Sequence, residues 1–418
     1  MKELIRKIFR GDAILWATIL CLFMISGLVM FSAISSSAHQ HADYLAPFWG
    51  HMRHILLGLL VMLVVHQFSY RSIRWVLYLI PLLSLTLLIA APLMGNDVNG
   101  AIRSIKVMGV EIQSIELTKL AIVFIFAEIL GFHNNHADKP MSWKTFGYIT
   151  GILVLFCALV FQQNISTMVM IFGLAVLMMF IGKVPLKYIG TLCGATLTIG
   201  IIAICTLLLI STYTDVKLPG RMGTAVNRLE RFFDAEDKDH NAPIVINDEN
   251  RQIINSKIAI ANGIKFVGPG NSVQRDYLSL AFSDFVYAII IEEYTIVGGI
   301  FIILLYVIIL ARAGKIARRC APHETAESLF VIGFSLLVVM QAFINMAVSC
   351  ELFPVTGQTL PLISRGGMSI LVTCFGFGLI LGISAHNEER IKKEMALKEP
   401  EETLSTNNQT ETPDSINQ

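Results

Sequence analysis

Long apolar runs recur along the chain, and they constrain its fold more than any other feature. Each run of about 17–25 mainly apolar residues is long enough to cross a bilayer as a helix. Of the 418 residues, 54% are hydrophobic and only 15% are charged. That charged share is well below the roughly one quarter found in soluble domains. The sequence therefore predicts an all-α polytopic membrane protein.

We expect about ten transmembrane helices. Lys and Arg are concentrated in the short loops of one side, which places both termini in the cytoplasm. The basic N-terminal stretch lacks an A-x-A-like cleavage site, so it indicates an uncleaved first helix and not a signal peptide. The expected helices are 13–35, 52–68, 74–94, 113–132, 146–162, 165–183, 188–213, 284–311, 325–349 and 366–386.

The same pattern divides the chain into three parts. Residues 1–12 form a cytoplasmic N-terminus, and residues 13–390 form the membrane domain. Within that domain, residues 214–283 form one large extracytoplasmic loop between helices seven and eight, with amphipathic pieces at 227–234 and 251–263. Such a long loop is usually functional or disordered. Residues 391–418 are rich in Glu, Lys, Thr, Asn and Gln, and we expect a disordered cytoplasmic tail.

Charge and cysteine usage argue against several classes of function. The net charge is +1, so nothing suggests binding to nucleic acid. The seven cysteines lie mostly inside apolar runs without paired spacing, and they indicate small core residues instead of a disulfide or metal framework. No metal-ligand spacing is visible elsewhere, so the sequence leaves a metal site unknown.

Asp284 is a carboxylate at the mouth of an apolar helix, and a charge there is costly unless it has a function. It ends the long outer loop, where the polar segment 271–283 meets the helix. Glu292 lies about 12 Å further along the same helix and is turned by roughly 80°. We therefore expect Glu292 and Glu293 to be structural groups, hydrogen-bonded within the bundle.

Two groups of charged residues lie near the start of the fourth helix. Glu116 and Lys119 are three residues apart and can pair on one helix face. The pair either pins the helix in the bundle or lets Lys119 reach an anionic ligand. Arg103 and Lys106 precede it in the outer loop. They are either ordinary loop cations or, together with Lys119, a basic funnel for a phosphate group.

The last outer loop, ELFPVTGQTLPLISRGG at 351–367, combines five Pro or Gly residues with apolar residues. The breakers prevent a continuous helix, and the apolar content indicates a re-entrant segment. Ser364 and Arg365 would then face a cavity. A plain surface loop is the alternative. The polar turn around Gln163 and Asn164 needs only local hydrogen bonds to explain it.

Five stretches together carry a family resemblance. The chain resembles the SEDS family (shape, elongation, division and sporulation), which includes the FtsW and RodA branches, over about residues 12–390. The most specific stretch is FPVTGQTLPLISRGGMS, whose GQTLPLISRGG form favours the FtsW branch. The stretches are 353–369, 283–293, 99–103, 113–119 and 268–278.

The resemblance implies a peptidoglycan glycosyltransferase. Such an enzyme polymerises lipid II, a disaccharide-pentapeptide on undecaprenyl pyrophosphate, at the outer face of the bacterial cytoplasmic (inner) membrane. It implies a class B penicillin-binding transpeptidase as partner. The FtsW-like form further implies other divisome proteins and a location at the division septum. A RodA-like elongation polymerase remains the alternative.

The resemblance also assigns residue roles. Asp284 matches the essential aspartate of the family, Glu116 and Lys119 match its functional pair, Arg103 matches its NGA-x-R motif, and Asp276 matches an acidic position eight residues before the aspartate. Several positions depart from the family pattern, which puts the roles of the lost groups in doubt. These positions are Ser104, Ser114, Asn164, Ser279, Leu280 and Phe282.

Glycan growth requires a sugar hydroxyl to attack an anomeric carbon that carries a lipid pyrophosphate. We expect Asp284 to take the hydroxyl proton, and Lys119, Arg103 and Arg365 to stabilise the leaving anion. A divalent cation, Mg²⁺ or Mn²⁺, is a candidate cofactor on the chemistry and the resemblance only. A flippase for lipid-linked precursors and a non-catalytic scaffold for the transpeptidase stay open as alternatives.

Overall fold

The computed structural model describes residues 9–37, 46–94, 104–107, 110–136, 141–213, 250–278, 282–320 and 324–410. A helix coincides with each of the ten predicted ranges. These helices are α2 (Ala13–Ser37), α3 (Ala46–Val65), α4 (Tyr70–Met94), α5 (Ser114–His136), α6 (Trp143–Phe161), α7 (Ile165–Ile181), α8 (Leu186–Tyr213), α11 (Val286–Cys320), α12 (Thr325–Ser349) and α13 (Gly367–Thr410).

Seven of these helices are long and apolar enough to cross a membrane, namely α2, α3, α4, α6, α11, α12 and α13. Apolar stretches of α7 and α8 are shorter, at Ile165–Ile181 and Leu186–Ile202. Helix α5 has 23 residues but carries Glu116, Lys119 and Glu128. The structure therefore agrees with a helical multi-pass membrane protein. The number of ten spans and their orientation stay predictions.

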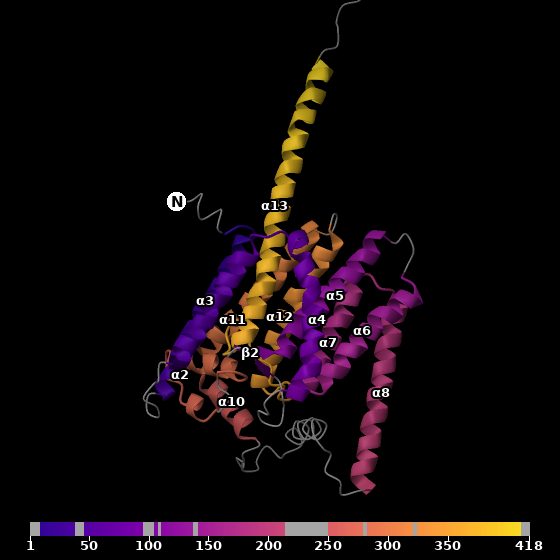
Figure 1. Ribbon diagram of the computed structural model, residues 1–418. Helices are drawn as coiled ribbons and strands as arrows, with labels where there is room; N and C mark the ends of the chain where they lie inside the picture. The colour runs from indigo at the N-terminus through magenta and orange to yellow at the C-terminus, as the bar shows by residue number, and fades with distance from the viewer. Residues whose placement is uncertain are drawn as a thin grey trace, which may run out of the picture.

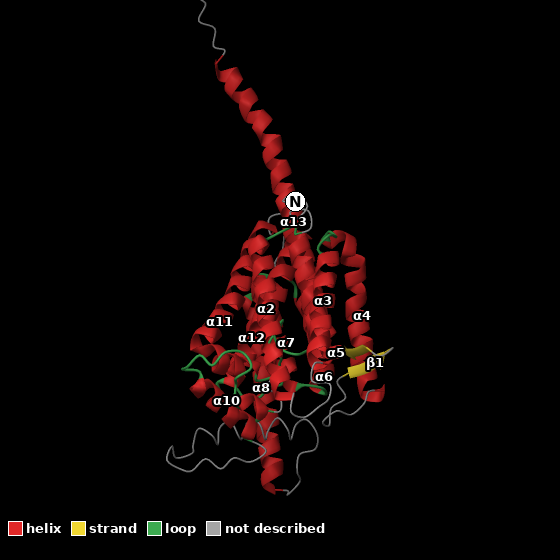
Figure 2. Cartoon of the chain, turned by 90° about the vertical axis from the view of Figure 1, so that its left-hand side faces the viewer, coloured by secondary structure: helices red, strands yellow, loops and turns green. Residues whose placement is uncertain are grey.

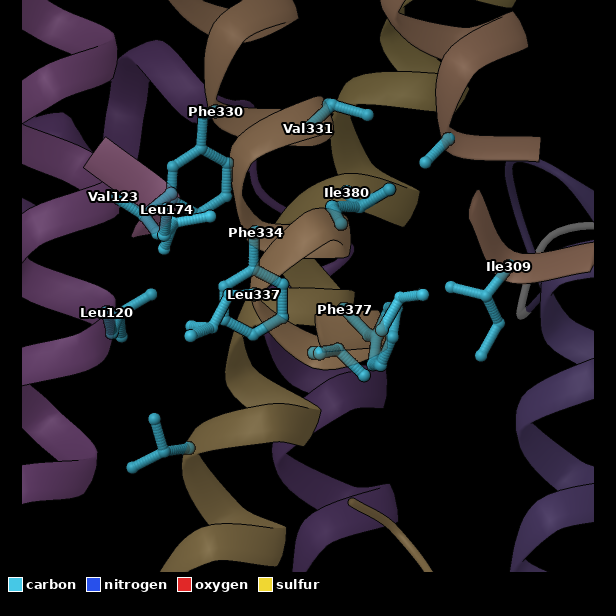
Figure 3. Packing of buried hydrophobic residues seen from close by; sticks show 14 of the residues in the cluster. Leu120, Val123, Leu174, Ile309, Phe330, Val331, Phe334, Leu337, Phe377 and Ile380 are labelled. Atoms are coloured by element: carbon cyan, nitrogen blue, oxygen red, sulfur yellow. The ribbon is translucent and has the colours of Figure 1, made fainter. Parts of the chain in front are cut away.

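The helices form one bundle in which α12 is central (Figure 1). Aromatic residues fill the space between α12 and α13: Phe330 stacks on Phe334 within α12, and Phe334 meets Phe377 of α13 edge to face (Figure 3). Gly376 permits this close packing, because a Cβ there would lie 2.0 Å from Phe334 Cζ. Small residues that let helices approach closely are typical of membrane bundles. Helix α8 lies at the edge of the bundle.

Four small elements, two strands and two short helices, lie at the end of the bundle opposite to the α13 tail (Figures 1 and 2). We call this the outer end, after the predicted orientation. Strands β1 (Ser104–Val107) and β2 (Val110–Gln113) pair antiparallel just before α5. Helix α10 (Arg251–Asn262) matches the predicted amphipathic piece at 251–263, and the 3₁₀ helix η1 (Gln274–Asp276) follows it. The predicted piece at 227–234 lies outside the described residues.

Helix α13 differs from the predicted domain boundary. It continues beyond residue 390 to Thr410 and leaves the bundle as a single helix (Figure 1). The prediction of a disordered tail rested on the lack of apolar residues for a core. Residues 387–399 consist mainly of Glu and Lys, with single Arg, Met, Ala and Leu residues; these are good helix formers and need no core to favour a helix. Residues 411–418 lie outside the described residues.

Candidate functional site

A non-helical segment between α12 and α13 forms the floor of the candidate site. Residues 360–364 are buried, and the hydroxyl of Tyr306 on α11 donates a hydrogen bond to the carbonyl of Pro361. Tyr306 lies ten residues beyond Ile296, where α11 resumes after a break at Thr295, so the segment reaches deep into the bundle. Non-helical backbone survives at such depth only where protein surrounds it. The prediction of a re-entrant segment is confirmed, and the surface-loop alternative is wrong.

The re-entrant segment holds the turn that carries Asp284. The backbone N–H of Arg365 donates to the carbonyl of Phe282 at 2.9 Å. The hydroxyl of Ser364 donates to the carbonyl of Ser283 at 2.7 Å. Ser283 in turn donates its hydroxyl proton to Asp284 Oδ1 at 2.9 Å. Three consecutive residues before α11 are thereby fixed against the segment that the sequence analysis singled out.

A second set of bonds joins Asp284 to α12. Asn345 Nδ2 donates to the carbonyls of Asp284 at 2.8 Å and Gln358 at 2.7 Å. The neighbouring Gly357 has a φ of +67°, which favours glycine. A Cβ at Gly357 would lie 3.7 Å from Asp284 Oδ2. The Asp284 carboxylate therefore lies beside backbone that carries no side chain.

The predicted pair of Glu116 and Lys119 is present and lies in the same network. Lys119 Nζ is 2.7 Å from Glu116 Oε1 and 2.7 Å from Gln341 Oε1. Gln341 Nε2 donates to the carbonyl of Thr359 at 3.0 Å, in the re-entrant segment. Lys119 is only 2% exposed. An ammonium has three N–H donors, and these two bonds use two of them.

Ser26 of α2 and His51 of α3 support the re-entrant segment from the other side. The hydroxyl of Ser26 donates to the carbonyl of Ile363 at 2.8 Å and lies 2.7 Å from His51 Nε2. A serine has one hydroxyl proton, and the carbonyl can only accept. His51 must therefore donate from Nε2, which fixes its protonation at that nitrogen. Ser26 and His51 are both buried.

Glu292 and Glu293 have the structural role that was predicted. Asn262 Nδ2 donates to Glu292 at 3.1 Å, and the hydroxyl of Ser272 also donates to this carboxylate. The N–H of Gly270 donates to Glu293 at 3.0 Å. Both carboxylates thus fasten the stretch between α10 and η1 onto α11.

The remaining predicted site residues differ in their surroundings. Ser364 is buried, and Arg365 beside it is exposed. Asp276 lies on η1, about half exposed, with its Oδ1 3.5 Å from Arg275 Nε. Arg103 lies outside the described residues, as does the side chain of Lys106. The predicted basic funnel is therefore untested.

Residues that depart from the family pattern make local contacts where they are described. The hydroxyl of Ser114 donates to Gln163 Oε1 at 2.9 Å. Asn164 Oδ1 accepts from the N–H of Thr167 at 3.2 Å and caps α7, which confirms the local explanation for this residue. Gln163 instead bonds to Ser114 and to the carbonyl of Leu88, so the local explanation is wrong for it. Phe282 packs against the apolar core. Ser104 begins β1, and 279–281, which includes Leu280, lies outside the described residues.

Sequence reasoning missed four residues of this network. Gln341 and Asn345 are two carboxamides one helical turn apart in an otherwise apolar helix. Such polar groups inside a membrane segment mark functional positions, so this signal could have found them. Ser26 and His51 are separated by 25 residues in the chain and by more than 300 from Ile363. No local pattern connects them.

Comparisons with known proteins agree with this arrangement. The profile of the FtsW/RodA/SpoVE family, described as a cell cycle protein, matches residues 13–389. The chain is 31% identical to the probable peptidoglycan glycosyltransferase FtsW of Marinobacter nauticus, over 76% of this chain and 74% of the relative. It is also 31% identical to the protein of the same name from Alcanivorax borkumensis, over 89% and 92%.

The fold is shared with a solved structure. A chain of a peptidoglycan synthase complex that coordinates polymerization and crosslinking aligns with a TM-score of 0.64 and 21% identity, over 90% of this chain and 98% of that one. The family profile spans every element of the site described above, from Ser26 to the re-entrant segment. This chain therefore belongs to the FtsW/RodA/SpoVE family of membrane proteins.

Proposed function

We propose that the chain is a peptidoglycan glycosyltransferase that polymerises lipid II. One observation carries the proposal: the carboxylate of Asp284 lies beside the bare backbone of Gly357, on a turn that the buried re-entrant segment holds in place. Holding a catalytic group in a fixed geometry can lower a barrier by several kcal/mol. The names of the relatives, probable peptidoglycan glycosyltransferases, support the same activity.

In this proposal Asp284 is the general base. It takes the proton from the attacking sugar hydroxyl as that oxygen bonds to the anomeric carbon, and the lipid pyrophosphate leaves with the electrons of its C–O bond. Cations stabilise the departing charge. Lys119 uses two of its three N–H donors within the described part of the chain, and Arg365 is exposed beside the segment. Arg103 is proposed from the sequence alone.

A divalent cation is a further part of the proposal. Within the described ranges, no three His, Cys, Asp or Glu side chains gather into a metal site. A cation such as Mg²⁺ or Mn²⁺ needs only one carboxylate when substrate phosphates and water complete its shell. Asp284 would be that carboxylate. When bound, such a cation would neutralise charge on the pyrophosphate.

We propose the division septum of the bacterial cytoplasmic membrane as the site of action. A class B penicillin-binding transpeptidase and other divisome proteins are the proposed partners. The FtsW names of the relatives support division over elongation. Depletion of the chain in its native host tests this choice, because filamentous cells indicate division and rounded cells indicate elongation.

The activity is tested by incubating the purified chain in detergent with lipid II and separating the glycan products. We expect polymer from the wild type and none from Asp284→Asn. Glu389→Gln is the matched control, because it removes the same charge at the α13 end of the bundle from an exposed ion pair with Arg10. Polymer formation by folded Asp284→Asn would contradict the assignment of the base.

The same assay separates the alternatives. A flippase gives no glycan in detergent, where the two sides of a membrane do not exist. A scaffold gives no glycan either, and Asp284→Asn would still support division in cells. Failure of the wild type together with a complementing Asp284→Asn would therefore overturn the enzymatic proposal.

A further inference from the structure

Helix α11 is interrupted near its outer end, and a neighbouring turn completes the interruption. Thr295 has non-helical backbone angles, with φ 67° and ψ 175°. A break of this kind leaves backbone groups without their helical partners. The N–H of Ile296 donates instead to the carbonyl of Gly263 at 3.1 Å, and the carbonyl of Glu293 accepts from the N–H of Gly268 at 3.1 Å. The N–H of Val297 donates to the Thr295 hydroxyl.

The residues between Gly263 and Gly268 thus form a turn, Ile264–Val267, that is fixed to α11 at both ends. The contact is close: a Cβ on Gly263 would lie 2.6 Å from the carbonyl oxygen of Ile291. The turn therefore lies at the same depth as residues 293–296 of α11. Figure 2 shows the loop next to α10 lying along the side of the bundle, and not above its end.

The depth of this turn follows from the length of α11. Sixteen residues separate Ile296 from Arg312, a rise of about 24 Å. Arg312 Nε is 3.0 Å from Asp12 Oδ1, and this ion pair lies at the start of the first helix. The hydrocarbon core of a bilayer is about 30 Å thick. If that core begins at Arg312, it extends about 6 Å beyond Ile296.

The side chains of the turn suit hydrocarbon. Ile264 is 80% exposed and Phe266 is 68% exposed. Val297, directly below the interruption, is 73% exposed and continues the apolar surface along α11. Lys265 lies between the two apolar side chains, and its long stem allows the ammonium to reach the headgroups. The backbone is paired at both ends of the turn, at Gly263 and Gly268, and the carbonyl of Val267 accepts from Asn271 Nδ2 at 2.8 Å.

We infer that the turn Ile264–Val267 inserts into the acyl chains of the outer leaflet and anchors the outer segment to the membrane. The occupant of the exposed surface is lipid, because this surface is continuous with the outer face of a membrane helix and lies within the thickness of the hydrocarbon core. The anchor fixes the position of the stretch between α10 and η1 relative to the outer leaflet. The inference rests on the membrane fold and not on the proposed enzymatic activity.

Spin labels test the insertion directly. Ile264→Cys and Phe266→Cys are labelled with a nitroxide in a full-length chain whose native cysteines are replaced, in nanodiscs of phosphatidylethanolamine and phosphatidylglycerol. We expect high accessibility to oxygen and low accessibility to a water-soluble nickel complex. Val297→Cys is the control for lipid, and Arg251→Cys, exposed at the start of α10, is the control for water.

Two outcomes would overturn the inference. Nickel accessibility equal to that of the Arg251→Cys label would place the turn in water. Low accessibility to both reagents would show that protein covers it, as a second copy of the chain or a partner helix would. A second measurement keeps every native cysteine: p-benzoylphenylalanine in place of Phe266 should form lipid adducts under ultraviolet light. Adducts with protein alone would likewise refute the lipid contact.

Discussion

Asn345→Leu is the substitution that tests the candidate site most directly. Asn345 donates its two side-chain N–H groups to two carbonyls, those of Asp284 and Gln358. Leucine has the same branching and the same number of side-chain heavy atoms, although its methyl groups are larger, and it donates nothing. The change therefore removes the connection between α12 and the Asp284 turn while keeping the helix packing.

The expected magnitude follows from those two bonds. Each buried carbonyl that loses its donor costs about 1–3 kcal/mol, so the folded state loses about 2–6 kcal/mol unless the segment relaxes. Relaxation moves Asp284, and a displacement of about 1 Å in an active site can lower the rate about 100-fold. We expect kcat to fall about 10- to 100-fold, with little change in the KM for lipid II.

The assay is lipid II polymerisation in detergent, together with the melting temperature of the purified variant. Ser335→Ala is the matched control, because Ser335 lies buried on the same helix and its hydroxyl has no hydrogen-bond partner in the described part of the chain. We expect the control to keep wild-type kcat. A folded Asn345→Leu variant with kcat within twofold of the wild type would refute the reasoning that this residue positions Asp284.

Three further predictions concern the same network. Glu116→Leu leaves the buried charge of Lys119 without its partner and should destabilise the fold by about 3–5 kcal/mol. Adding Lys119→Met should recover most of the melting temperature but no activity. A double variant as unstable as the single variant would argue against the ion pair. His51→Leu removes the donor to Ser26 and should lower kcat at least tenfold. His51→Gln should keep most of the wild-type kcat, because its amide N–H can replace Nε2. Equal kcat values for the two variants would exclude a positioning role of His51. Chelation with EDTA should abolish polymerisation, and adding Mg²⁺ or Mn²⁺ should restore it. Unchanged turnover in EDTA would contradict the divalent cation and would indicate that the Lys and Arg side chains are sufficient.

The helices could be predicted from sequence because the membrane enforces a minimum length of apolar chain. All ten predicted ranges coincide with a helix. Their ends were less predictable where solvent replaces lipid. Helix α11 continues through the basic residues to Cys320, and α13 continues to Thr410. Helix propensity determines where these solvent-exposed helices end, and the pattern of apolar residues does not predict it.

The candidate site was predictable in part. Asp284 and the pair of Glu116 and Lys119 stood out because charges are rare in apolar helices. The bonds that position them were not predictable. They join α2, α3, α11 and α12 to one irregular segment, and no periodicity in the sequence encodes contacts between such distant stretches. The departures at Ser114 and Asn164 show the same limit, since only the structure reveals which hydrogen bonds these side chains make.

The re-entrant segment makes the position of Asp284 depend on the separation of two neighbouring helices, α2 and α11. Ser26 of α2 holds Ile363 at 2.8 Å, and one residue later Ser364 holds the turn before α11 at 2.7 Å. Hydrogen bonds weaken steeply beyond about 3.2–3.5 Å. A displacement of α2 relative to α11 by less than about 1 Å would therefore break this line of bonds. A small lateral force on the bundle would therefore be transmitted through the segment and would displace the Asp284 carboxylate.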